Sequence, residues 1–364
     1  MLHHSILAYS YYARFDRLHY LRSSAPIVDH NRWIGFDLLV DFNDIYFMSL
    51  MFLISGLFVM PSLSRRGSWN YLAGRAVRLG LPFLVAVTVI MPVAYYPSYL
   101  QTGASLSFPQ YWIGYFTSYG WPAGPAWFIW VLLTLDALAV LVAMLNPAVV
   151  QNGTVISDWL LKRPSVGLGL LLAVAALAYL PMLYVFGPTR WFSWGPFAVQ
   201  ASRVALYAIF FATGAVLGAA GLTHPLLGRA GPFAKGWTVC AGLALIAFCG
   251  LAALQRSTLL HDSLQWHALG AVLFILVCVL TGVALIGGFI RHLDVNRSWL
   301  DLLAPSAFAI YVLHYAPLTW IQTALLASEI PAVAKASATF IGTLFVSCIL
   351  AALLRQSPKL RQVL

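Results

Sequence analysis

Long apolar runs separated by short polar segments cover most of the chain. An α-helix needs about 20 residues, at 1.5 Å per residue, to cross a hydrocarbon core of about 30 Å. Runs of roughly this length occupy residues 36–60, 79–96, 126–145, 166–186, 203–221, 236–254, 267–290, 305–326 and 333–354. Their continuous apolar character predicts membrane-spanning helices, because the strands of a membrane barrel would alternate apolar and polar residues.

Residues 1–12 form a further apolar segment that is too short to cross a membrane. At helical rise they reach only about 18 Å, so the segment is typical of the second half of a spanning helix. No basic segment precedes it, which argues against a signal peptide. We therefore expect an all-α polytopic bundle of about ten spans, with a truncated first helix, forming one integral membrane domain over residues 1–364.

Composition supports a membrane location. The chain is 61% hydrophobic and 9% charged, with a mean hydropathy of +0.83, whereas about 25% of the residues of a soluble domain are charged. The net charge of +10 does not indicate nucleic-acid binding, because the cations lie in short loops between apolar runs. The expected environment is the lipid bilayer.

The most basic of these loops lies at residues 61–78. It carries Arg65, Arg66, Arg75 and Arg78 and no acid, which predicts a cytoplasmic hairpin by the positive-inside rule. Alternate loops carry further cations on the same side, so both termini are expected in the cytoplasm. Pro82 is expected near the start of the helix that follows, where a missing N–H is tolerated.

Several ionisable residues fall inside or beside the apolar runs. His3 and His4 lie near mid-membrane if the first helix is placed as a full span, and an ionisable residue at that depth is a functional candidate. The alternatives are a hydrogen bond to a neighbouring helix, or a terminal tail in water. Asp37, Asp41 and Asp44 share one face of the helix at 36–60.

The three acids are expected to differ in role. Asp37 suits a solvated helix end, whereas Asp41 and Asp44 lie deeper and are candidates to orient a histidine. Arg75 and Arg78, three residues apart, suit either phosphate recognition or simple anchoring by charge.

Two other candidate residues, Trp127 and His314, also suit a purely structural role. Trp127 opens the helix at 126–145 and is typical of an interfacial aromatic belt, and His314 in the helix at 305–326 suits a buried hydrogen bond as well as a reactive group. The four cysteines lie in apolar runs without metal-ligand spacing, so no metal site is expected.

Five segments, in order along the chain, resemble those of the membrane-bound acyltransferase 3 family. They are His4-Ser-Ile-Leu-Ala-Tyr9; Met48 to Ser55-Gly56, similar to M-x-L-F-F-x-x-S-G; Arg75 to Pro82, similar to R-x-x-R-L-x-x-P; Trp127-Phe-Ile, similar to W-F-L; and Ser306 to Pro317, similar to S-x-x-I-Y-L-x-H-x-P. The resemblance covers nearly the whole chain and is nearest to the branch that succinylates periplasmic glucans.

The resemblance implies a multi-pass O-acyltransferase of the bacterial inner membrane. Such enzymes move an acyl group from cytoplasmic acyl-CoA, a co-substrate, to a hydroxyl of a carbohydrate or glycolipid at the cell envelope, without a permanently bound cofactor. It implies His4 as the essential histidine, Arg75 and Arg78 as the CoA-binding pair, and an arginine one helix length before the histidine, which would precede residue 1.

Further roles follow from the residue chemistry. A carboxylate at Asp41 or Asp44 suits the task of holding the imidazole and stabilising its cation. His314, Trp127 and Ser55 are further site candidates. An acetyl and a succinyl donor remain equally compatible with the sequence. The alternative function is transport or export of a glycan or lipid, although the chain shows neither an internal repeat nor paired broken helices.

Overall fold

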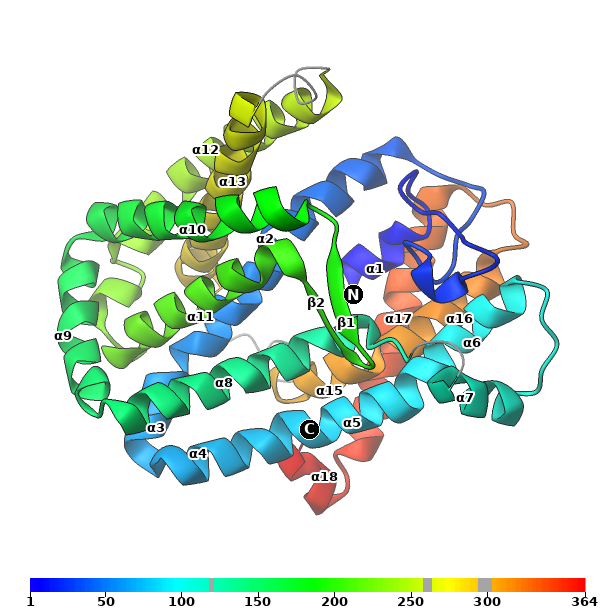
Figure 1. The fold of residues 1–364 in the computed structure, drawn as a ribbon, viewed down its shortest axis with the longest axis horizontal. Coiled ribbons are helices and arrows are strands. Elements are labelled where there is room, and N and C mark those ends of the chain that lie inside the picture. Colours follow the sequence, from blue (N-terminus) through cyan, green and yellow to red (C-terminus); the bar gives the residue numbers. More distant parts are fainter. Residues whose placement is uncertain (118–120, 258–263, 294–302, 364) are drawn as a thin grey trace.

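The computed structural model describes residues 1–364 except 118–120, 258–263, 294–302 and 364, and it forms a helical bundle with one small β-hairpin (Figure 1). Its α-helices are α1 (Leu2–Leu7), α2 (Ile34–Leu57), α3 (Val59–Arg66), α4 (Ser68–Arg75), α5 (Leu81–Val85), α6 (Met91–Gln101), α7 (Phe108–Thr117), α8 (Trp127–Leu145), α9 (Ala148–Lys162), α10 (Pro164–Phe186), α11 (Val204–Ala219), α12 (Pro232–Arg256), α13 (Leu264–His292), α15 (Ala307–Leu313), α16 (Tyr315–Leu325), α17 (Ala332–Leu354) and α18 (Pro358–Val363). The hairpin pairs β1 (Trp191–Trp194) with β2 (Phe197–Gln200) in antiparallel register.

Eight helices among the described residues are long and apolar enough to cross a membrane. They are Ile34–Arg66, Ser68–Gln101, Gly124–Leu145, Pro164–Phe186, Ala201–Ala219, Pro225–Arg256, Gln265–His292 and Ala332–Leu354. This confirms the polytopic helical bundle. The count differs from the expected ten because α1 has only six residues and the run at 305–326 is divided into α15 and α16.

The basic segment at 61–78 is helical, and the prediction of a loop there was wrong. Residues 59–66 form α3, and the chain turns at Gly67, whose φ of +73° is readily available only to glycine. The next helix therefore begins at Ser68. Pro82 consequently lies inside a long helix, instead of in its first turn as the sequence suggested.

Two prolines inside the helix Ser68–Gln101, Pro92 and Pro97, remove backbone hydrogen bonds that indole groups replace. Two π-helical turns, Ala76–Gly80 and Ala86–Ile90, come shortly before Pro82 and Pro92. A proline at position i leaves the carbonyl of residue i−4 without its usual partner. Pro92 does this to Thr88, whose oxygen accepts the indole N–H of Trp112 at 2.8 Å.

Pro97 repeats the arrangement one turn further along. The carbonyl that it leaves without a helical partner belongs to Val93, and that oxygen accepts the indole N–H of Trp320 at 3.0 Å. Trp320 lies on α16, so the second bond joins two helices. The two indole groups thus compensate for Pro92 and Pro97 in a hydrophobic environment, where unpaired backbone groups are costly.

Glycines let α2 and α11 approach closely. A Cβ atom at Gly56 would collide with the backbone oxygen of Phe211, and one at Gly214 or Gly218 would collide with the backbone of α2. Small residues of this kind are typical of helix contacts in membranes. The Ser55-Gly56 segment therefore has a packing role, and the hydroxyl of Ser55 bonds within its own helix, to the oxygen of Met51 at 2.8 Å.

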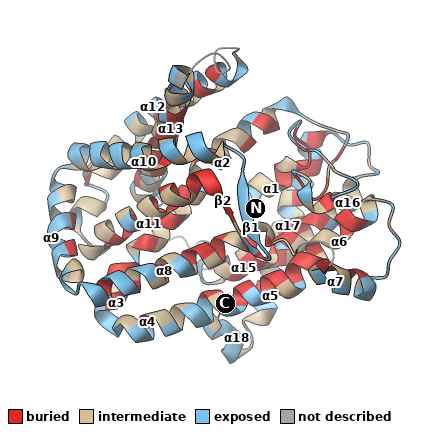
Figure 2. Ribbon diagram, viewed as in Figure 1, coloured by how far each residue is buried: buried red, intermediate tan, exposed pale blue. Residues whose placement is uncertain are grey.

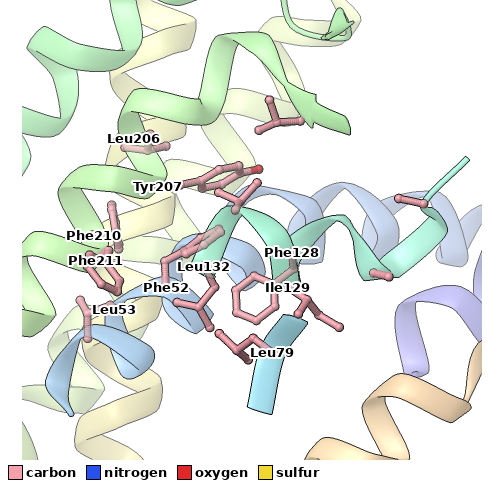
Figure 3. Packing of buried hydrophobic residues seen from close by; sticks show 14 of the residues in the cluster. Phe52, Leu53, Leu79, Phe128, Ile129, Leu132, Leu206, Tyr207, Phe210 and Phe211 are labelled. Atoms are coloured by element: carbon pink, nitrogen blue, oxygen red, sulfur yellow. The ribbon is translucent and has the colours of Figure 1, made fainter. Parts of the chain in front are cut away.

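Large side chains fill the space beside this contact. Phe52 stacks on Tyr207 of α11, with ring centroids 5.0 Å apart, and lies 4.7 Å from the ring of Phe128 of α8 (Figure 3). Buried residues concentrate along the inner faces of α2, α8 and α11, whereas only Ala175 and Tyr179 are buried in α10 (Figure 2). In a membrane protein such an exposed apolar surface faces lipid.

Candidate active site

The loop that precedes α2 and the helix α17 hold the short helix α1 in place. The N–H groups of Asp29 and Trp33 donate to the carbonyl oxygens of Ala8 and Tyr9, each at 3.0 Å. The hydroxyl of Tyr9 lies 3.1 Å from that of Thr339 on α17. The loop between α1 and α2 therefore folds back on the end of α1 and keeps it packed against α17.

A buried ion pair reinforces this arrangement. The ammonium of Lys335 lies 2.7 Å from a carboxylate oxygen of Asp29, and both side chains are fully buried. The other carboxylate oxygen of Asp29 accepts the N–H of Asn31 at 2.8 Å. This pair was not predicted from the sequence. The lone lysine in an otherwise apolar helix was nevertheless a detectable signal, because a charge inside a membrane requires a partner.

His4 lies inside the bundle, surrounded by aromatic rings. Its ring centroid is 5.3 Å from that of His3, 5.6 Å from that of His314 and 5.2 Å from that of Tyr315. Its backbone oxygen accepts a hydrogen bond from the side-chain amide of Gln322 at 3.1 Å, and Gln322 is 1% exposed. The alternative of a terminal tail in water is therefore wrong.

His314 lies where the helix of residues 307–325 is interrupted. Pro317 lacks an N–H and its ring crowds the carbonyl of Leu313, so the hydrogen-bond ladder is interrupted between α15 and α16. The backbone of His314 itself stays helical, with φ −59° and ψ −27°. The Nδ1 of His314 lies 2.5 Å from the backbone oxygen of Tyr311. A carbonyl oxygen can only accept, so Nδ1 carries the proton and Nε2 presents a lone pair.

The remaining ring nitrogen of His314 lies in the interior of the bundle. Its Nε2 is buried and has no hydrogen-bond partner among the described residues. Several other buried side-chain atoms also lack a partner. What distinguishes the Nε2 of His314 is its place beside a second imidazole, whose ring centroid is 5.6 Å away, and this placement suggests a chemical role. The neighbouring Tyr311 is held in place by its hydroxyl, which donates to the backbone oxygen of Pro125 at 2.5 Å.

The aspartates of α2 have partners other than His4. The hydroxyl of Tyr12 donates to Asp41 at 2.8 Å, and Arg203 donates to both the carboxylate and the backbone oxygen of Asp44 at 2.6 Å. The rings that surround His4 belong to other residues, so the structure does not bring Asp41 or Asp44 onto the imidazole. Asp37 is buried and accepts the N–H of Tyr12 at 3.0 Å, so the expectation of a solvated end was wrong.

The two candidate arginines differ in environment. The Nε of Arg75 lies 2.5 Å from a carboxylate oxygen of Asp136 on α8, and the hydroxyl of Tyr71 donates to the other oxygen at 2.5 Å. Arg78 is exposed on the π-helical turn Ala76–Gly80. Asp136 was not identified from the sequence, although it is the single acid in the apolar helix α8.

Additional cations lie beside Arg78. The C-terminal helix α18 packs against the turn Ala76–Gly80 and carries Lys359 and Arg361. We call the surface formed by Arg78, Lys359 and Arg361 the basic surface. Its excess of positive charge attracts anions, since the three side chains are all cationic and lie on adjoining segments.

A cavity of about 310 Å³ lies between α3, α9 and the end of α11. Its lining includes Ser64 and Arg65, together with apolar residues such as Met60 and Val150. The long helix Ser68–Gln101 connects this part of the bundle with the histidines, because the ring of Tyr95 on α6 lies 5.9 Å from that of Tyr315. Twenty residues separate positions 75 and 95, which is about 30 Å of helix.

Trp127 has a packing role in this structure. Its ring lies 5.6 Å from those of Trp191 in the hairpin and Tyr207 on α11. A second tryptophan of α8, Trp130, donates its indole N–H to the oxygen of Ala198 at 2.9 Å. The two tryptophans fasten the hairpin to the bundle, and neither contacts the histidine pair.

Comparison with known proteins gave one match. A protein-family model described as an acyltransferase domain, of the acyltransferase 3 type, matches residues 1–352. Searches of curated proteins and of solved structures found no match.

Proposed function

The chain belongs to the membrane-bound acyltransferase 3 family, and on that premise we propose that it transfers an acyl group from acyl-CoA to a hydroxyl of a carbohydrate or glycolipid. The observation that carries this proposal is the pair formed by His4 and His314, with ring centroids 5.6 Å apart inside the bundle. Two imidazoles at that depth are uncommon, because ionisable groups within a membrane are costly unless they serve a function.

His4 is assigned the role of general base. A sugar hydroxyl is scarcely ionised at neutral pH, so the base removes its proton as the oxygen attacks the thioester carbonyl. The C–O bond forms, the C–S bond breaks, and the proton passes from the imidazole to the departing CoA thiolate. A positioned histidine contributes about 10²- to 10⁴-fold to such a reaction.

His314 supports this role in place of Asp41 and Asp44. Because its Nδ1 proton is committed to the oxygen of Tyr311, its Nε2 remains a hydrogen-bond acceptor beside His4. An acceptor at this place favours the arrangement in which one nitrogen of His4 carries a proton and the other has a free lone pair. The bundle interior also excludes water, which limits hydrolysis of the thioester.

The donor is proposed to enter at the end of the bundle that carries the basic surface and Arg75. CoA carries several phosphate charges, and guanidinium groups bind phosphate through paired N–H donors. The cavity beside Arg65 offers additional space for the nucleotide portion. The acyl-bearing arm then extends along the helix Ser68–Gln101 toward Tyr95 and the histidines.

The location follows from the direction of transfer. Acyl-CoA is a cytoplasmic metabolite, so the end that carries Arg75, Arg78 and the C-terminal helix α18 is placed in the cytoplasm, whereas Met1 packs inside the bundle. The protein is then a multi-pass protein of the bacterial inner membrane, and its acceptor is a component of the envelope such as a glucan. The transferred acyl group is proposed to be an acetyl or a succinyl group.

A reconstituted system tests the proposed activity. Purified protein in liposomes is supplied with acetyl-CoA or succinyl-CoA and an envelope glycan or lipid fraction. Release of free CoA that requires both the protein and the acceptor supports the enzyme. Passage of unmodified glycan across the bilayer, without release of CoA, would support the transporter alternative instead. Mass spectrometry of the acceptor then identifies the acyl group.

A further inference from the structure

Asp136 is an ionisable residue buried in the interior of the bundle. It lies in the apolar helix α8 and is 0% exposed. A buried carboxylate in a membrane protein persists only with partners that compensate for the loss of water. Both of its oxygens have such a partner, and both partners come from one helix, α4.

The two partners are four residues apart. Tyr71 and Arg75 therefore lie on the same face of α4, and that face is turned toward α8. The guanidinium carbon of Arg75 lies 6.0 Å from the centre of the Tyr71 ring, so the ring flanks the arginine side chain. Together, the carboxylate and the ring limit the orientations open to the guanidinium.

The bond to Asp136 uses only part of the guanidinium. Arginine has five N–H donors, of which one belongs to Nε, and it is Nε that contacts Asp136. The four donors on the terminal nitrogens have no hydrogen bond to another described residue. The Arg75 side chain is 26% exposed, so this end of it remains accessible to a ligand.

We propose that Asp136 is a positioning residue for the acyl donor. It acts through Arg75 by holding Nε, and so directs the terminal nitrogens toward a phosphate of CoA. This inference rests on the proposed function, because it assumes that the donor is a CoA thioester. A guanidinium that is already ordered loses less side-chain entropy when the ligand binds, which improves affinity.

The test measures binding and does not require the acceptor. The full-length protein in lipid nanodiscs is titrated with CoA and with pantetheine, which lacks the phosphates. In the wild type, CoA binds more tightly than pantetheine. Asp136→Asn keeps the shape of the side chain and is expected to raise the Kd for CoA about tenfold, the change that 1.4 kcal/mol of side-chain ordering produces. The Kd for pantetheine stays within about twofold.

Two comparisons separate positioning from a purely structural role. In an Arg75→Ala background, Asp136→Asn produces no further change in the Kd for CoA, because the residue acts through Arg75. Asp158→Asn removes the same charge from an exposed ion pair with Lys162 and leaves CoA binding unchanged. If Asp136→Asn does not accumulate in the membrane, Tyr71→Phe serves instead, with an expected rise of about threefold, because it removes one partner of the carboxylate without changing charge.

The possible failures are distinguishable. If the wild type binds CoA and pantetheine equally, no guanidinium holds the phosphates, and the proposed donor site fails together with this inference. If the wild type prefers CoA and Asp136→Asn binds it equally well, only the role of Asp136 is overturned. An equal loss of affinity for both compounds also overturns it, since that pattern reports general distortion of the bundle.

Discussion

The ring centroids of His4 and His314 lie 5.6 Å apart, although 310 positions separate the two residues in the sequence. One ring belongs to a six-residue helix at the start of the chain, and the other to the break between α15 and α16. The sequence suggested a carboxylate of α2 as the partner of His4. The structure replaces it with a second imidazole.

Substitution of His314 tests the importance of this pairing. His314→Ala removes the free Nε2 beside His4 and is expected to lower the rate of acyl transfer about 100-fold. His314→Asn restores a side-chain N–H that can bond to the oxygen of Tyr311, but it supplies no bare ring nitrogen, so its rate stays low while it folds normally. Full activity of His314→Asn would contradict the proposed role of Nε2.

Gln322 is expected to affect catalysis through the position of α1. Gln322→Ala removes the bond to the backbone oxygen of His4, and the displaced imidazole should lower kcat about tenfold. The KM for acyl-CoA should stay within about twofold, because the arginines lie about 30 Å away along the helix. The adjacent Thr323→Ala is the matched control, since its hydroxyl bonds only within α16. Equal effects of the two variants would refute the assignment.

The contact between α2 and α11 should not tolerate a Cβ atom. Gly56→Ala places a methyl group against the backbone of α11 and is expected to reduce the free energy of unfolding by about 1–3 kcal/mol. Gly242→Ala, in the middle of α12, meets no atom within 4 Å and should be neutral or slightly stabilising. Thermal unfolding in detergent measures both, and a similar melting temperature for the two variants would count against close packing here.

The buried pair of Asp29 and Lys335 should behave as a coupled unit. Lys335→Met leaves a buried carboxylate without its cation, at an expected cost of about 3–5 kcal/mol in the free energy of unfolding. The double variant Asp29→Asn/Lys335→Met removes both charges and should recover most of this loss. Chemical denaturation compares the two, and additive losses would show that the charges are not coupled.

Local sequence pattern determined most of the fold. The run predicted at 333–354 matches α17 at Ala332–Leu354, and the run at 126–145 matches α8 at Trp127–Leu145. Hydrophobic periodicity and the length of an apolar run are local properties of the sequence, so they can be recognised without knowing which helices pack together. The start of the helix at Ser68 was missed because the apolar run begins only at Leu79, after the basic residues. Only distant residues, such as Trp112, reveal that the lost backbone bonds are replaced.

The candidate site was harder to predict from the sequence than the fold. His4, Arg75 and His314 were identified, since unusual charges in apolar runs and the family resemblance both pointed to them. Their partners were not identified. Arg75 and Asp136 lie on different helices and are 61 positions apart in the sequence. No local periodicity encodes a contact over this distance. A lone acid or lysine in an apolar helix signals that a partner exists without naming it.

The most direct test of the account is the acyl content of envelope glycans from cells that carry either the wild-type gene or His4→Ala. The measurement is made by mass spectrometry and divided by the amount of protein inserted in the membrane. If an imidazole at this position is the base, acylation should fall by at least about 100-fold while insertion and unfolding temperature stay unchanged. Acylation within twofold of the wild type would contradict the central claim.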